Sequence, residues 1–124
     1  MQYNQTVKRR NLYRRVAKIL NGLLELPPRE MEIFSILLRL DNEWKPVLET
    51  EVKDVLTAAS RKAIMRDTLI NKNNLSKYIS DLKSKRLIVK NEQGGYEVNK
   101  LFPITINDNI VNISFNIHIE DETN

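Results

Sequence analysis

The chain has 124 residues, 41% hydrophobic and 29% charged, and a formal net charge of +4, which describe an ordinary globular domain rather than a disordered chain. The absence of cysteine and the single histidine argue against a zinc finger or an iron–sulfur centre and fit a reducing cytoplasm. No run approaches the roughly 18 apolar residues that span a bilayer, and residues 1–20 lack the apolar core of a signal peptide, so we expect a cytoplasmic protein with no membrane partner.

A basic amphipathic helix is predicted over residues 6–24, with Thr6 as its N-cap. Its apolar residues recur at the three- and four-residue spacing of one helix face: Leu12, Val16, Ile19, Leu20 and Leu23. Pro27 and Pro28 end this helix, and Pro28 suits the first turn of the next one.

A second helix is predicted over residues 29–40, with a broad apolar stripe that suits a central helix packed on more than one side. The stripe consists of Met31, Phe34, Ile36, Leu37, Leu38 and Leu40. Residues 41–45 form a loop before a third helix, which we expect over residues 49–58. The inward side chains of that third helix would be Val52, Val55 and Leu56.

A short helix over residues 60–67 and a longer one over residues 71–85 come next. Ser60 is the predicted cap of the short helix. Its inward residues would be Ala63, Ile64 and Leu69. The longer helix has the clearest periodicity in the chain. Its apolar face, at positions i, i+4 and i+7, consists of Leu75, Ile79 and Leu82, with Tyr78 beside them.

Two β-prone regions follow the last helix. Runs 87–90 and 96–98 flank a turn that contains Gly94 and Gly95, which is typical of a β-hairpin. The tail contains Ile104-Thr105-Ile106 and then a strictly alternating run with Val111, Ile113, Phe115, Ile117 and Ile119 on one face. This alternation predicts a half-buried strand, or a second hairpin. Such a strand is an aggregation hazard if exposed, so it packs on its own domain or adds to a partner's sheet.

The order of a short helix, a brief turn, a longer helix and an immediate hairpin resembles that of winged helix-turn-helix proteins. MarR-like regulators and plasmid or phage replication initiators share this pattern. The likeness is close over residues 69–98, where Leu75, Ile79 and Leu82 match the inward aliphatics and Leu87-Ile88 matches the start of the first wing strand. At fold level it covers residues 28–100.

The resemblance implies a mainly α fold with a small β component. It divides the chain into a basic N-terminal helix (1–26), a winged helix domain (27–100) and a C-terminal β extension with an acidic tail (101–124). One position departs from the family, which commonly has Gly directly before the Leu-Ile pair, where this chain has Arg86. Either Arg86 adopts a positive φ, at a cost of roughly 1 kcal/mol, or the helix ends differently.

The resemblance also implies that the 71–85 helix enters the major groove of double-stranded DNA. Its outward residues are the short polar side chains and cations that read base edges and meet phosphates: Lys72, Asn73, Asn74, Ser76, Lys77 and Ser80. Further backbone contacts would come from Arg61, Lys62, Arg66, Lys83 and Lys90. For Asn73 and Asn74 helix capping is an equal alternative, and for the lysines the alternative is a solvated face.

The charge distribution favours a polyanionic partner on particular faces. Residues 60–90 carry nine basic and two acidic side chains, a net charge of +7, and residues 1–20 carry six basic and no acidic ones. Residues 25–57 have a net charge of −4, and residues 101–124 have four acids and no Lys or Arg. The hairpin turn has Glu92 but no cation, so we expect a structural wing, with Tyr96 packed against the sheet.

Three interpretations are open for the N-terminal cations, which are Lys8, Arg9, Arg10, Arg14 and Arg15. We rank packing first, either within the chain or in a homodimer with Leu12, Val16, Ile19 and Leu23 as its seam. A second DNA contact ranks next, and a helix lying on an anionic membrane ranks last.

No catalytic constellation is found. His118 has no Cys or second His with which to bind a metal, and three glycines cannot form a phosphate loop. We expect no enzyme, no catalytic residue, no metal and no cofactor. The expected function is DNA binding at the nucleoid, as a transcription regulator or a replication-initiation accessory encoded by a phage or plasmid. The alternative is a protein–protein interaction or assembly module that docks through residues 25–57 or through the tail strand.

Overall fold

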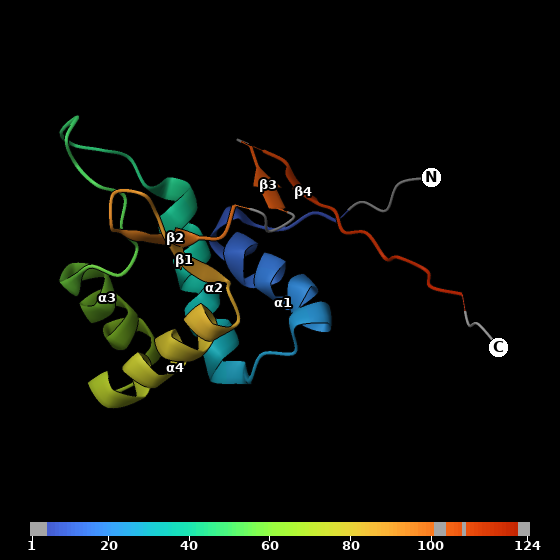
Figure 1. Cartoon of the computed structure of the whole chain (residues 1–124), viewed down its shortest axis with the longest axis horizontal. Helices are drawn as coiled ribbons and strands as arrows, with labels where there is room; N and C mark the ends of the chain where they lie inside the picture. The colour runs from blue at the N-terminus through green and yellow to red at the C-terminus, as the bar shows by residue number, and fades with distance from the viewer. Residues whose placement is uncertain (1–4, 101–103, 108, 122–124) are drawn as a thin grey trace.

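The computed structural model describes residues 5–100, 104–107 and 109–121. It is mainly helical and contains two antiparallel sheets of two strands each. Helix α2 (Pro28–Glu43) is central: α1 (Leu12–Leu24) packs on one side of it, and α3 (Ala58–Thr68) and α4 (Lys72–Ser84) pack on the other (Figure 1). The predicted features at Asp108 and Glu122, and at residues 101–103, lie outside the described residues.

The N-terminal helix begins later than predicted. A 3-10 turn, η1 (Arg9–Asn11), precedes α1, and Thr6 lies outside both, so its predicted capping role was wrong. The physical reason is electrostatic: three consecutive cations, Lys8 to Arg10, disfavour a helix N-terminus, which carries partial positive charge. At the other end, Glu25 adopts a left-handed conformation and Asn21 clamps the turn by accepting the Leu26 N–H at 2.7 Å.

Pro28 occupies the first turn of α2, as predicted, and the helix continues to Glu43. It buries Ile33, Phe34, Leu37 and Leu38. Because α2 contacts α1, α3, α4 and the first hairpin, the prediction of a central helix is confirmed.

The helix predicted over residues 49–58 was wrong. Residues 44–57 contain no helix; residues 52–56, which we call the backing segment, lie beside the first hairpin. The Val55 N–H donates to the Tyr96 carbonyl at 2.9 Å, and an Asp54 carboxylate oxygen accepts the Tyr96 N–H at 3.2 Å. Val55 is buried as predicted but Val52 is exposed. Hydrogen bonds to distant residues thus override the local apolar spacing.

Helix α3 is capped by Thr57, whose side chain accepts the Ser60 N–H at 3.1 Å, so the predicted cap at Ser60 was wrong. Ser60 lies inside the first turn instead. Leu69 was also predicted wrongly, because it is exposed. It ends α3 in a left-handed conformation, φ 59°, which turns Leu69 outward and brings Ile70 into the core.

Helix α4 follows the prediction closely. Asn71 caps it by accepting the Asn74 N–H at 2.8 Å, and Leu75, Ile79 and Leu82 are buried. The helix ends with Arg86 at φ 62°. The Leu87 N–H donates to the Leu82 carbonyl and the Arg86 N–H to the Lys83 carbonyl, which is a Schellman ending built without glycine.

The predicted first hairpin is confirmed: β1 (Ile88–Lys90) pairs with β2 (Tyr96–Val98), with Val89 opposite Glu97. A second hairpin joins β3 (Ile104–Ile106) to β4 (Val111–Ile113). The prediction of a longer half-buried strand was wrong, because the alternating run beyond Ile113 has no regular secondary structure and its apolar side chains are exposed. Alternation alone does not supply the second layer that would bury them.

One hydrophobic cluster joins all four helices and β1. Val16 and Leu20 of α1 belong to the same cluster as Phe34 of α2, Ile64 of α3 and Ile79 of α4. The buried side chains therefore hold the inner face of α4 in the core, which determines which of its residues face outward.

Candidate nucleic-acid interface

The outward residues of α4 form an uncovered surface, which we call the α4 outer face. All six are solvent-exposed, on the side opposite the buried aliphatics: Lys72, Asn73, Asn74, Ser76, Lys77 and Ser80. No described segment of the chain covers them. The first turns of α3 and α4 contain no acidic residue, so no carboxylate opposes an anion at either helix start.

The capping alternative for Asn73 and Asn74 is resolved by Asn71. The cap hydrogen bond uses the Asn71 side chain, and Asn74 contributes only its backbone N–H. The side chains of Asn73 and Asn74 are exposed, with both amide donors and the amide oxygen available for contacts outside the chain.

The predicted cations of α3 differ in how they are held. Lys62 and Arg66 are exposed and lie one turn apart. Arg61 is half-buried, and its Nε donates to the Leu56 carbonyl at 3.1 Å. Arg66 approaches Asp67 at 3.4 Å, but an exposed pair of this kind contributes little and is easily exchanged. Lys62 and Arg66 are therefore the predicted cations of this helix that are open to solvent, while Arg61 holds the start of α3.

Lys83 is occupied within the chain. Its Nζ lies 4.1 Å from the centre of the Tyr96 ring, a cation–π contact across the end of α4 and the first hairpin. This contact holds Tyr96 against α4, a role for Lys83 that the sequence did not indicate. Lys90, in contrast, is exposed at the end of β1.

Asn91 organises the hairpin turn, a role that we did not predict. Its side-chain oxygen accepts the Gln93 and Gly95 N–H groups at 3.1 and 2.9 Å, and its Nδ2 donates to the Lys53 carbonyl at 2.8 Å. Asn is common in turns because its side chain forms hydrogen bonds with the nearby backbone, so the hydrogen bonds within the turn could have been predicted from the sequence. The bond to Lys53 could not, because it joins residues far apart in the chain.

The N-terminal cations occupy a different surface from the α4 outer face. The five predicted residues are exposed, as is Lys18, and α2 separates α1 from α3 and α4 (Figure 1). Arg9 donates to Asn109 at 3.3 Å, which ties η1 to the second hairpin.

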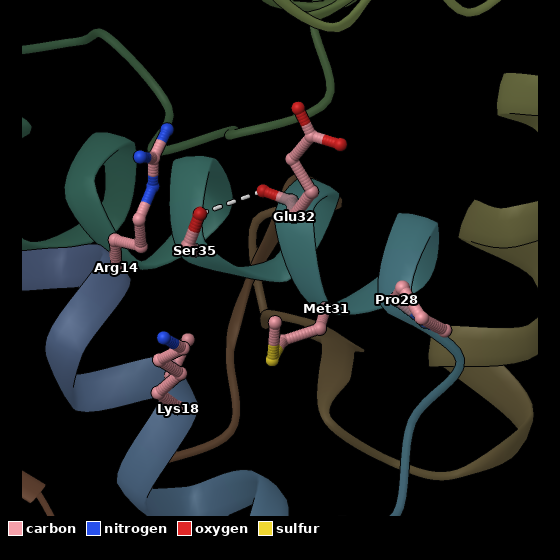
Figure 2. Close-up of a pocket in the computed structure, with 7 residues that line it drawn as sticks. Arg14, Lys18, Pro28, Met31, Glu32 and Ser35 are labelled. Atoms are coloured by element: carbon pink, nitrogen blue, oxygen red, sulfur yellow. Dashed lines mark hydrogen bonds between the residues drawn. The ribbon is translucent and has the colours of Figure 1, made fainter.

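A pocket of about 270 Å³ lies between α1 and α2. Figure 2 shows Arg14 and Lys18 on the α1 side and Met31, Glu32 and Ser35 on the α2 side, with the Ser35 hydroxyl donating to the Glu32 carbonyl at 2.7 Å. No residue of α3 or α4 lines this pocket, so it is separate from the α4 outer face.

Among residues 5–100, 104–107 and 109–121, no cluster of three or more His, Asp or Glu side chains is arranged to hold a metal ion. In the same residues no helix has the length and apolar character needed to cross a membrane. Comparisons with protein-family models, curated proteins and solved structures give no match to this chain.

Proposed function

We propose that this chain is a winged helix-turn-helix protein that binds double-stranded DNA by placing α4 in the major groove. We further propose that it acts as a transcription regulator or a replication-initiation accessory. The observation that carries the proposal is the α4 outer face: short polar and cationic side chains, all exposed, on a helix whose other face is fixed in the core.

The element order supports the winged-helix assignment. Helices α3 and α4 are joined by three residues, 69–71, the turn length of a helix-turn-helix. The hairpin begins directly after α4, and the backing segment braces it from the other side through Val55 and Asn91. These hydrogen bonds hold the hairpin beside α3 and α4, the position that the wing has in a winged helix.

The side chains divide into base-reading and backbone-contacting groups. Asn73 and Asn74 carry the amide that pairs bidentately with adenine in the major groove. Lys72 and Lys77 meet guanine or phosphate, and Lys62, Arg66 and Lys90 contact the phosphate backbone. The hairpin turn has no cation, so the wing in this proposal positions α4 without entering the minor groove.

The first test separates electrostatic binding from sequence reading. Affinity for duplexes selected from a random pool is measured by fluorescence anisotropy at several salt concentrations. The K72A/K77A variant is expected to bind more weakly and to reduce the slope of log affinity against log salt by up to about 2, since each phosphate contact contributes roughly 0.9. The matched control, K45A/K100A, removes two exposed lysines elsewhere and is expected to leave the slope unchanged.

The N73A/N74A variant provides the second test. It removes no charge, so it is expected to keep the salt slope and lose sequence preference, at roughly 1–3 kcal/mol for each base contact. A wild-type protein that shows no salt dependence and selects no sequence would refute the proposal. That result would favour the assembly-module alternative.

A further inference from the structure

The structure leaves two apolar rows without a partner. On α1, Ile19 and Leu23 lie one turn apart and are 46% and 56% exposed. In the tail segment, which we define as residues 114–121, Phe115, Ile117 and Ile119 are 53%, 79% and 89% exposed. Scattered exposed apolar side chains are ordinary, but contiguous rows mark an interaction site.

The tail segment extends away from the folded part of its own chain. Figure 1 shows it running outward from β4, past the side of the molecule that carries α1. Every residue of the segment is exposed, and so are Ile19 and Leu23. The two rows therefore remain uncovered in the single chain, although both lie on the same side of it.

The distance between neighbouring apolar side chains is similar in the two rows. One helical turn separates Ile19 from Leu23 by about 6 Å along the helix axis. If the tail segment adopted strand geometry on binding, every second side chain would point to the same face, about 6.6 Å apart. Two consecutive apolar side chains of the tail segment would thus match the α1 row.

The charges of the two surfaces are complementary. Arg15 is exposed one turn before Ile19, in the same row of α1, whereas Arg14 and Lys18 line the pocket against α2; residues 5–24 contain no acid. The tail segment contains Glu120 and Asp121 and no Lys or Arg. Among the described residues, none of these five charges takes part in an ion pair within the chain.

We propose that the tail segment of one copy packs across α1 of a second copy, and that the second copy returns the same contact. Phe115, Ile117 and Ile119 would cover Ile19 and Leu23, and the acidic end would face Arg15, one turn before Ile19. A reciprocal exchange of this kind closes as a two-fold symmetric dimer. It also covers the apolar tail, which is a hazard when exposed.

Engineered cysteines test which copy the tail contacts, because the chain contains none of its own. The L23C and I117C variants are mixed and oxidised, and each is also oxidised alone. The mixture is expected to give a disulfide-linked species of twice the 14.5 kDa monomer mass, well above the amount formed when the exposed control S84C replaces L23C. If the mixture does not cross-link and the L23C/I117C double variant closes within one chain, the tail folds onto its own α1 and the proposal is overturned.

Sedimentation equilibrium without DNA tests the interface. Wild type is expected to dimerise, and both I19D/L23D and I117D/I119D are expected to raise the dimer Kd at least tenfold while keeping the circular dichroism of wild type. The control V47D/L48D changes two exposed apolar residues of a loop and should leave the Kd unchanged. E120K/D121K should also raise the Kd, whereas E49K/E92K, with the same change in net charge, should not.

A wild-type chain that stays monomeric at all concentrations would overturn the proposal. A dimer that persists in the tail variants would also overturn the proposal. If only the α1 variant disrupted the dimer, the two copies would pack helix to helix rather than through the tail. These measurements contain no DNA, so a failed dimer proposal leaves the proposed DNA binding standing.

Discussion

Gly95 is buried against the backing segment, and no larger residue fits its place. A Cβ built there collides with the Lys53 carbonyl, a backbone atom that cannot move aside. We expect G95A to lower the free energy of unfolding by about 1–3 kcal/mol, the usual cost of overpacking. Urea unfolding followed by Trp44 fluorescence measures it, since the chain has one tryptophan.

The matched control for G95A is G22A. Gly22 lies on α1 with no atom near its missing Cβ, and Ala is favoured over Gly inside a helix by about 1 kcal/mol. G22A should therefore stabilise the protein. Equal effects from both substitutions would contradict the argument from the Lys53 carbonyl.

Leu69 and Arg86 lie on either side of α4, and both hold a left-handed backbone conformation, φ 59° and 62°. The family resemblance left two outcomes open for Arg86, a positive φ or a different helix ending, and the structure shows the positive φ. Nothing in the sequence indicated a positive φ for Leu69, whose apolar character pointed to the core. A left-handed backbone conformation points the side chain to the opposite side, and the spacing of apolar residues along the sequence does not indicate where this occurs.

At the scale of elements, α2 and α4 are joined by a buried carboxylate. Glu30, in the first turn of α2, is fully buried and accepts from the Lys85 Nζ at 3.0 Å. The lysine side chain is still 42% exposed, so water weakens the pair. The positive end of the α2 dipole also stabilises Glu30.

We expect K85A to destabilise the protein by about 1–2 kcal/mol, because it leaves the buried Glu30 carboxylate without its cation. The E30Q/K85A double variant should recover part of the loss, since it removes the buried charge as well. The control K62A alters an exposed lysine with no ion pair among the described residues and should change the free energy of unfolding by less than about 0.5 kcal/mol. If K85A changed the free energy of unfolding no more than K62A does, the Glu30–Lys85 ion pair would contribute nothing to the stability of the α2–α4 contact.

Elements defined by local chemistry could be predicted from the sequence, and those defined by distant contacts could not. Periodicity located α4, and the glycine pair located the first hairpin. The backing segment was mistaken for a helix because its partners, Tyr96 and Asn91, lie about 40 residues further along the chain. The same cause explains the contact of Lys83 with the Tyr96 ring, which the sequence did not indicate.

At the scale of the whole molecule, the central helix α2 separates two basic surfaces. The α4 outer face lies on one side of α2, and the basic face of α1 lies on the other (Figure 1). The sequence located both basic blocks, because net charge is additive along a chain. It did not place them on separate surfaces, which depends on how α1 and α4 pack around α2. With this arrangement, the proposed contact of α1 with a second copy and the proposed contact of α4 with DNA would not compete for one surface.

The two proposals together make a prediction about binding sites. A two-fold dimer presents two copies of α4, so sequences selected by wild type should be inverted repeats whose half-site centres lie about 10 base pairs apart, or a multiple of that. The monomeric I117D/I119D variant should select the single half-site and bind the full repeat at least tenfold more weakly, because it loses the second contact. Selection with both proteins from the same random pool measures this. If wild type selected single half-sites, the dimer would play no part in DNA recognition. If the variant selected inverted repeats, the tail would not set the spacing of the two α4 helices.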